Sequence, residues 1–164
     1  MRYLLLFSLL LPLLSCSPRL DPFGTETGDY LASFDHYAIN VENLNRSIDF
    51  YQQVFGLDEV HNGTGKENIR WLSLGAGMAL HVIETDRSQL RLQKGVHMAI
   101  SVGRFDEFVE HLRDIELPFE TWQGVALESN DRPDGVRQVY FQDPDGYWIE
   151  VNNGRILFGK PALP

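Results

Sequence analysis

A short pattern occurs twice in this chain and constrains its fold more than any other feature. The sequence HYAINV spans residues 36–41, and HMAISV spans residues 97–102. Each copy is followed by a segment with the apolar spacing of an amphipathic helix. Because internal self-similarity is the signature of a repeated structural unit, we expect two copies of one module. Each copy carries a histidine on a strand, which points to a site formed where two modules meet.

The predicted elements follow the same order in both copies. The first copy has a strand at 34–41, a helix at about 44–55 and strands near 57–62, 69–74 and 79–84. The second copy has a strand at 95–102, a helix at about 104–115 and strands near 118–122, 138–142 and 147–152. The loop at about 123–136 makes the second copy longer. One stripe of each helix is apolar, so each helix needs a sheet face to cover, as in an α+β fold.

Alternation along the strands indicates which residues face away from the helices, because successive side chains point to opposite sides of a sheet. The apolar residues of the strands form one set, which includes Ile39, Val82 and Ile149. The opposite set contains His36, His81, His97 and Glu150. Three histidines and one glutamate are therefore expected on the face without helices, and curvature of the sheet would bring them together.

These four residues predict a metal site. Imidazole nitrogens with a carboxylate oxygen suit Zn²⁺, Ni²⁺, Co²⁺, Mn²⁺ or Fe²⁺, and the lack of thiolate ligands argues against a closed structural zinc site. His36 and His81 occupy the same places in the first copy as His97 and Glu150 in the second. This repeated placement distinguishes them from isolated strand histidines, and it predicts a divalent metal ion as cofactor.

The motifs that carry these residues resemble the vicinal oxygen chelate superfamily of glyoxalase I, bleomycin-resistance proteins and extradiol dioxygenases. The resemblance covers about residues 33–153, and its most specific parts are DHYAINV at 35–41, NRSIDFY at 45–51, GVHMAISV at 95–102 and FQDPDGYWIEV at 141–151. It implies paired βαβββ modules that form a cupped, eight-stranded mixed sheet with helices on the convex face. It also implies a divalent metal held at His36, His81, His97 and Glu150.

The function implied by the resemblance is that of a metal-dependent lyase or isomerase of the glyoxalase I type. Such an enzyme chelates a small substrate through neighbouring carbonyl or hydroxyl oxygens and transfers a proton, and Glu150 is the expected catalytic base. The sequence departs from glyoxalase I at His81, where that branch usually has a glutamate.

Three alternatives stay open. One is a small-molecule binding protein of the bleomycin-resistance type. Another is an extradiol-type dioxygenase with Fe²⁺ on His36, His97 and Glu150. A transferase of the fosfomycin-resistance type is the third. Each would act on or bind a small molecule, for which Arg70, Arg132, Arg137 and Trp148 are the expected contacts.

The N-terminal residues predict export and lipid anchoring. Residues 1–16 combine Arg2, a leucine-rich run and Leu-Leu-Ser-Cys, which resembles a bacterial lipoprotein signal with Cys16 as the lipidated residue. The apolar run is too short to span a bilayer. Residues 17–32 are predicted to be a flexible tether, and residues 154–164 a C-terminal tail. The protein is therefore expected on the membrane of the cell envelope, attached through its lipid.

Charge and size limit the remaining partners. The formal net charge of −9 argues against nucleic acid, whose phosphates require clustered Lys and Arg. Cys16 is the only cysteine of the chain, so no disulfide forms within it. About 130 residues remain for one domain. The two modules could pair within the chain or be exchanged between two chains, so a homodimer is an open expectation.

Overall fold

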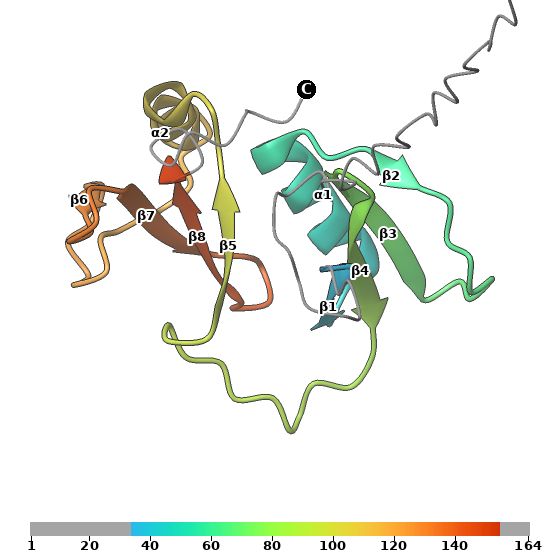
Figure 1. The fold of residues 1–164 in the computed structure, drawn as a ribbon. Helices are drawn as coiled ribbons and strands as arrows, with labels where there is room; N and C mark the ends of the chain where they lie inside the picture. Colours follow the sequence, from blue (N-terminus) through green and yellow to red (C-terminus); the bar gives the residue numbers. More distant parts are fainter. Residues whose placement is uncertain (1–33, 155–164) are drawn as a thin grey trace, which may run out of the picture. The chain divides into compact units, whose positions relative to one another are not determined.

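The computed structural model describes residues 34–154. The predicted signal peptide, Cys16, the tether and residues 155–164 of the tail lie outside the described residues. Within the described part, no helix has the length and apolar character needed to cross a membrane. The elements that follow are shown in Figure 1.

The first module has the predicted order of elements. Strand β1 (His36–Val41) leads into helix α1 (Leu44–Phe55), and β2 (Glu59–Val60), β3 (Ile69–Gly75) and β4 (Met78–Glu84) follow. Strand β1 pairs in parallel with β4, and β3 pairs antiparallel with both β4 and β2. The resulting sheet has the order β1-β4-β3-β2.

The second module repeats this topology. Strand β5 (His97–Ser101) leads into helix α2 (Phe105–Asp114), and β6 (Asn130–Asp131), β7 (Arg137–Gln142) and β8 (Trp148–Asn152) follow. The sheet order is β5-β8-β7-β6, again with a parallel pair between β5 and β8. The prediction of two equivalent βαβββ modules in an α+β fold is confirmed. The eight strands form two four-stranded sheets.

One predicted strand was wrong. The segment near 118–122 forms only isolated bridges, in which Glu120 pairs with Ala126 and Tyr140. The strand that pairs with β7 is Asn130–Asp131, inside the segment that was expected to be a loop. The physical reason is a turn at 121–124, closed by the Gly124 N–H donating to the Thr121 carbonyl at 3.0 Å, which ends the extended segment early.

Local signals define both ends of α1. The side chain of Asn43 accepts a hydrogen bond from the backbone N–H of Arg46 at 2.9 Å, which satisfies a donor at the first turn. At the other end Gly56 has φ 65° and ψ 31°, a left-handed conformation in which its N–H donates to the Gln52 carbonyl. The predicted bounds of this helix, 44–55, are therefore confirmed.

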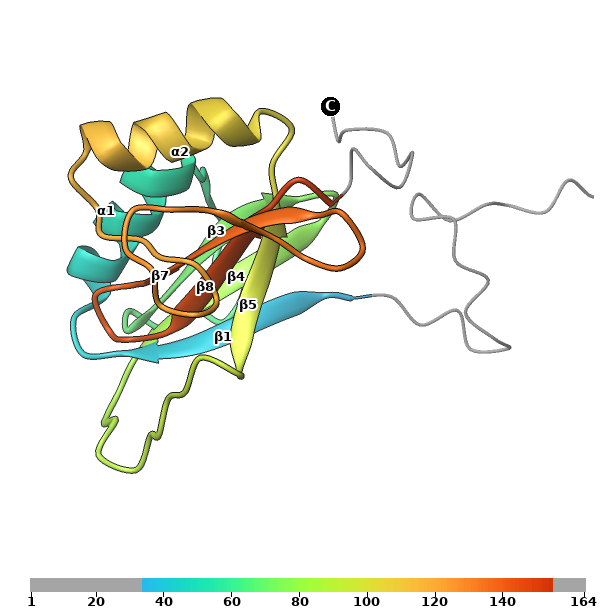
Figure 2. The same ribbon diagram turned by 90° about the vertical axis from the view of Figure 1, so that its left-hand side faces the viewer.

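The apolar faces of both sheets contribute to one hydrophobic core. Ile39, Leu80 and Val82 of the first module and Ile149 and Val151 of the second are all buried in the same cluster. Helix α1 of the first module also contacts the second module. Its Phe55 ring lies 5.5 Å from Phe108 of α2 and 6.0 Å from Phe141 of β7, measured between ring centroids. The two helices accordingly lie side by side in Figure 2.

A buried carboxylate in the turn before β8 connects the modules. The side chain of Asp145 is fully buried and accepts hydrogen bonds from the Glu42 N–H at 2.8 Å and the Ser47 hydroxyl at 2.6 Å. The guanidinium groups of Arg46 and Arg87 lie 3.2 and 3.1 Å from the same carboxylate. All four partners belong to the first module or to the segment that follows it. The turn at 143–146 therefore fixes how the modules pack.

Asp143 adds a second contact between the modules. Its carboxylate accepts the Tyr51 hydroxyl of α1 at 2.9 Å and the backbone N–H groups of Asp145 and Tyr147. Burial raises the pKa of Asp143 above its ordinary value of 3.8, and these hydrogen bonds offset only part of that effect.

Replacing Asp145 should loosen the packing of the two modules. In Asp145→Asn the buried donors of Ser47 and Arg87 lose their charged acceptor, so we expect the free energy of unfolding to fall by about 3 kcal/mol. Chemical denaturation of both proteins measures this change. The matched control is Glu107→Gln, which removes an exposed ion pair with Arg104 and should cost about 0.5 kcal/mol or less. Equal losses in the two variants would contradict the assignment.

Asp143 should make stability depend on pH in a defined direction. Because its pKa is raised in the folded chain, the folded state retains the proton longer than the unfolded state does. The contribution of Asp143 is thus fully present below its unfolded pKa and is lost as pH rises through its folded pKa. The unfolding free energy of the wild type minus that of Asp143→Asn should therefore decrease as the pH rises from below the ordinary carboxyl pKa of 3.8. A flat or rising difference would rule out this role.

Candidate functional site

The first module places three aromatic rings in a stack on the face that carries no helix. The centroid of the His81 ring lies 4.1 Å from that of Trp71 and 4.0 Å from that of His36, with interplanar angles of 5° and 10°. Trp71 and His81 are direct partners across the β3–β4 ladder. Burial lowers the pKa of His81, and positive charge on His36 adds to this effect. A neutral, stacked His81 therefore lies beside His36.

This stack limits how the two imidazoles could share a metal. The lone pair of an imidazole nitrogen lies in the plane of its ring, and two nearly parallel planes do not meet near the rings. While the two rings are stacked, one ion cannot lie in the ring planes of both His36 and His81. His81 would have to rotate out of its stack with Trp71 to become a ligand of the same ion.

His36 itself is oriented by a carboxylate. Its Nδ1 atom lies 2.6 Å from Oδ2 of Asp35. Because an ionised carboxylate can only accept a hydrogen bond, Nδ1 is the donor in this contact and Nε2 is the ring nitrogen that points away from Asp35. Histidine ligands of metals are commonly oriented in this way by a second partner.

The second module brings His97 and Glu150 into contact. The Nε2 atom of His97 lies 3.1 Å from Oε2 of Glu150, and its Nδ1 atom lies 2.8 Å from the carbonyl oxygen of Lys94. The contact follows from the parallel β5–β8 ladder, in which His97 pairs with Trp148 and Ala99 with Glu150. Glu150 is buried, with 4% of its surface exposed.

Three further donors surround the Glu150 carboxylate. The Tyr140 hydroxyl donates to Oε2 at 2.5 Å, and Oε1 accepts from the Asn152 amide at 2.6 Å and from the Arg132 guanidinium at 3.2 Å. Burial raises the pKa of Tyr140 well above its ordinary value, and the hydrogen bond to Glu150 raises it further. The carboxylate is thus held in one position by its neighbours.

The predicted substrate residues divide between the two faces of the sheets. Arg132 lies at the candidate site, where it also pairs with Asp134, and Trp148 lies on the same side of β8 as Glu150. Arg70 instead contacts Asn45 of α1 and pairs with Glu59, and Arg137 lies over Phe105 of α2. Both arginines therefore occupy the helix-bearing faces, because they share the strand side of buried core residues.

Sequence reasoning missed several residues around Glu150. Tyr140 could have been found, because it alternates with buried Val139 and Phe141 and pairs with Glu150 across the β7–β8 ladder. Asn152 could have been found by the same argument along β8. Lys94 carried no recognisable signal, since it lies in a turn and reaches its partners through a long side chain.

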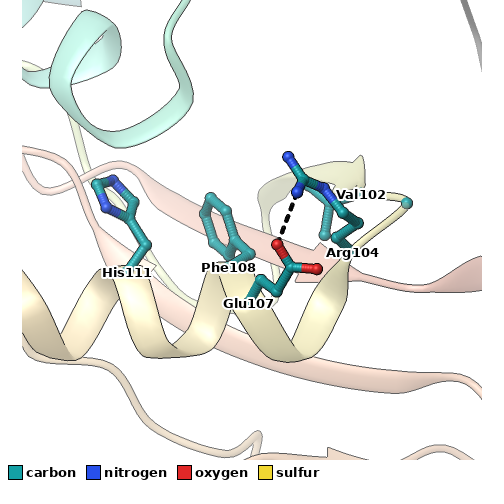
Figure 3. A pocket seen from close by; sticks show the side chains of 6 residues that line it. Val102, Arg104, Glu107, Phe108 and His111 are labelled. Carbon is teal, nitrogen blue, oxygen red and sulfur yellow. Dashed lines mark hydrogen bonds and ion pairs between the residues drawn. The ribbon is translucent and has the colours of Figure 1, made fainter.

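A groove of about 420 Å³ lies elsewhere, along the first turns of α2 (Figure 3). Phe108 stands between His111 and the ion pair of Arg104 and Glu107, whose charged atoms are 2.7 Å apart. The lining residues are Val102, Gly103, Arg104, Glu107, Phe108 and His111. Helix α2 covers the opposite face of the sheet from His97 and Glu150, so this groove is separate from the candidate site.

The four predicted ligands form two separate pairs. Among residues 34–154, no group of three or more His, Cys, Asp or Glu side chains is arranged to hold a metal ion. The His36–His81 pair and the His97–Glu150 pair lie on different sheets, each on the face that points away from the common core. The donor types suit a divalent metal. The Nδ1 atoms of His36 and His97 each contact a hydrogen-bond acceptor, which leaves Nε2 of each ring as the potential ligand atom. Each sheet thus holds only part of a potential metal site.

A bacterial metallothiol transferase and a bacterial fosfomycin resistance protein have sequences similar to this chain. The metallothiol transferase FosB of Lysinibacillus sphaericus is 28% identical over 131 residues, covering 76% of this chain and 84% of the relative. The fosfomycin resistance protein FosX of Listeria innocua is 22% identical over 129 residues, covering 77% of this chain and 92% of the relative.

Solved structures share the fold. The oxidase ChaP-H2 has a TM-score of 0.62 at 21% identity, covering 74% of this chain and 93% of its own. A structure of FosX from Listeria monocytogenes, complexed with Mn(II) and a dihydroxypropylphosphonic acid, has a TM-score of 0.57 at 21% identity, covering 75% of this chain and 90% of its own.

A family model agrees with the duplicated βαβββ modules and with these neighbours. The model of the Glyoxalase/Bleomycin resistance protein/Dioxygenase superfamily matches residues 33–151, which include all of the strands and helices described above except the last residue of β8. The chain therefore belongs to the Glyoxalase/Bleomycin resistance protein/Dioxygenase superfamily.

Proposed function

We propose that this chain is a divalent-metal enzyme that adds a nucleophile to a small substrate with adjacent oxygen atoms. The observation that carries the proposal is the geometry at Glu150, whose carboxylate contacts His97 Nε2 while Lys94 holds His97 Nδ1. The metallothiol transferase and fosfomycin-resistance relatives support the reaction class. The Mn(II) in the FosX structure, bound with a diol, supports the cofactor and the adjacent oxygens.

We further propose that two chains complete each site. Within one chain the two ligand pairs lie on faces that point away from the shared core, so they do not converge. Pairing the first module of one chain with the second module of another would let His36 face His97 and Glu150. This arrangement is a symmetric dimer in which each site takes one module from each chain.

The chain's own residues suit addition better than the proton transfer of glyoxalase I. Glu150 is held by Tyr140, Asn152 and Arg132, whereas a proton shuttle has to move during the reaction. In an addition, a bond forms between the nucleophile and carbon, a carbon–oxygen bond breaks, and the nucleophile's proton passes to the released oxygen. A bound metal would supply Lewis acidity to that oxygen. Arg132, whose side chain is 34% exposed, is the proposed contact for an anionic substrate group.

A metal-free binding protein of the bleomycin-resistance type is the second candidate. The observation in its favour is that Arg132 and, when protonated, His97 already balance the buried charge of Glu150 within one chain. Such a site would hold a small molecule without any ion. The absence of metal from the wild-type protein, even after incubation with Mn²⁺, Zn²⁺ or Fe²⁺, would favour this candidate.

A dioxygenase is the third candidate. With His81 stacked against Trp71 and His36, the ligand set reduces to His36, His97 and Glu150, which is a set of two histidines and one carboxylate. This set is typical of non-haem Fe²⁺ oxygenases and leaves positions open on the metal. Oxygen consumption with Fe²⁺ and an aromatic diol would distinguish it from nucleophile addition.

Removing His97 should weaken metal binding strongly. We expect His97→Ala to lower the Mn²⁺ affinity of the purified full chain at least about tenfold, because one ligand nitrogen is lost. His81→Ala should have a smaller effect, because its ring is stacked outside the ligand plane of His36. Titration calorimetry measures both, with Arg104→Ala at the exposed residue before α2 as the control. An unchanged affinity in His97→Ala would refute the ligand assignment.

Complementation between two inactive chains should test whether a site spans two chains. A mixed dimer of His36→Ala and His97→Ala chains contains one site with both histidines intact if each site is formed by two chains. The co-expressed mixture should then regain about one quarter of the wild-type metal content, whereas each variant alone stays empty. Elemental analysis of the unfractionated mixture provides the measurement. A mixture as empty as its components would show that each site belongs to a single chain.

A further inference from the structure

The last described residues lie beside the groove along α2. Strands β5 and β8 run in parallel and end at the same edge of their sheet. At this edge the Val102 N–H donates to the Asn152 carbonyl at 2.8 Å, and the Gly154 N–H donates to the Asn152 side chain at 3.0 Å. Val102 is one of the residues that line the groove. Residues 155–164, the predicted tail, therefore follow directly from a point one strand away from the groove.

The groove lies on the side of α2 that faces α1. The ring of Phe108 packs against Phe55 of α1 at 5.5 Å between centroids, and His111 Nε2 lies 3.1 Å from the Gln53 carbonyl oxygen. Figure 3 shows Phe108 at the middle of the groove. This ring is only half-buried, whereas the other apolar side chains on the same helix, such as Val109, are buried in the core. The groove therefore has an apolar floor with room for further side chains.

The residues that follow Gly154 are long enough to fill this groove. The groove follows about two turns of α2, which is about 11 Å at 5.4 Å per turn. An extended chain rises about 3.3 Å per residue, so the four residues 155–158 would cover about 13 Å. Alternate side chains of an extended segment share one side. Ile156 and Phe158 would then both lie against Phe108.

Charge also favours this segment as the occupant. Residues 104–116 contain five acidic residues and two arginines, whereas residues 155–164 contain Arg155, Lys160 and no acidic residue. Glu107 lies at the edge of the groove with 66% of its side chain exposed, so a cation can reach it. A second copy of the chain would instead bring a formal net charge of −9 towards an acidic helix. Apolar residues between two cations therefore suit the groove better.

We propose that residues 155–158 bind in the groove along α2 as an extended segment of the same chain. Ile156 and Phe158 cover the ring of Phe108, and Arg155 and Lys160 face the acidic helix. The segment thereby ties the end of β8 to α2. This inference does not depend on the proposed function, because the groove and the candidate site lie on opposite faces of the second sheet.

The test places a photoreactive side chain in the segment and maps what it touches. Benzoylphenylalanine replaces Phe158 in the full chain, and ultraviolet light links it to neighbouring residues. Mass spectrometry of the digested product identifies the linked peptide. The same chain is also made with Gly103→Leu in the groove or with Gly95→Leu in the turn before β5. A Cβ added at either glycine meets no atom within 4 Å, so both leucines fit the fold.

We expect links to residues 102–111 of the same chain. Gly103→Leu should lower their yield at least about fivefold, because the leucine side chain fills space that the segment needs. Gly95→Leu should leave the yield unchanged.

A charge variant serves if Gly103→Leu does not fold. Glu107→Lys changes an exposed residue and should lower the yield about threefold, because it repels the cations of the segment. Glu67→Lys makes the same charge change at an exposed residue of the first module and is the matched control.

Three results would overturn the proposal. The first is a product in which the linker reaches residues outside 102–111, or no linked product at all. The second is a product that joins two chains, which would show that the groove binds the segment of another copy. The third is an equal yield in a groove variant and its control, which would show that the segment does not use the groove.

Discussion

The Asp145 carboxylate fixes how the two modules pack, and the placement of every candidate site residue depends on it. Its partners come from the turn after β1, from α1 and from the segment after β4. One buried group in the second module thus contacts three parts of the first. Because an unpaired buried charge is costly, these donors and the carboxylate have to stay together. The apolar faces of both sheets are thereby held against a common core, and the opposite faces remain available for chemistry.

In this packing, the residues that form the core differ from the residues that form the candidate site. The core consists of residues that alternate with the candidate ligands along the same strands, as Ile149 and Val151 do with Glu150. The polar cluster around Glu150 is satisfied by its own neighbours, including Tyr140, Asn152 and Arg132. The described fold therefore needs no ion to compensate its buried carboxylate, in contrast to small domains that fold only around a metal.

Much of the fold followed from local patterns in the sequence. The repeat at 36–41 and 97–102 predicted two equivalent modules, and strand alternation predicted which side of each sheet carries His36, His81, His97 and Glu150. The same alternation would have excluded Arg70 and Arg137, which share a strand side with buried Leu72 and Val139. They were chosen instead for their charge and for their positions near strand ends.

The packing of the modules could not be predicted in this way. The segment Asp143-Pro144-Asp145-Gly146 has the composition of an ordinary turn, and nothing local reveals that its carboxylates meet Ser47 and Tyr51 more than ninety residues earlier. Such contacts depend on how two complete modules meet. For the same reason, the sequence suggested four converging ligands, whereas residues 34–154 of one chain hold them as two separate pairs on different sheets.

The order of strands has a consequence for association. Strands β1 and β5, which carry His36 and His97, are each the outermost strand of their sheet next to a parallel partner. An outermost strand has one row of backbone N–H and carbonyl groups without a ladder partner, and proteins usually cover or interrupt such rows. If β1 of one chain lay beside β5 of another, the two four-stranded sheets would join into a continuous surface. The strand edges that have no ladder partner among residues 34–154 and the incomplete ligand sets would then be completed by the same contact.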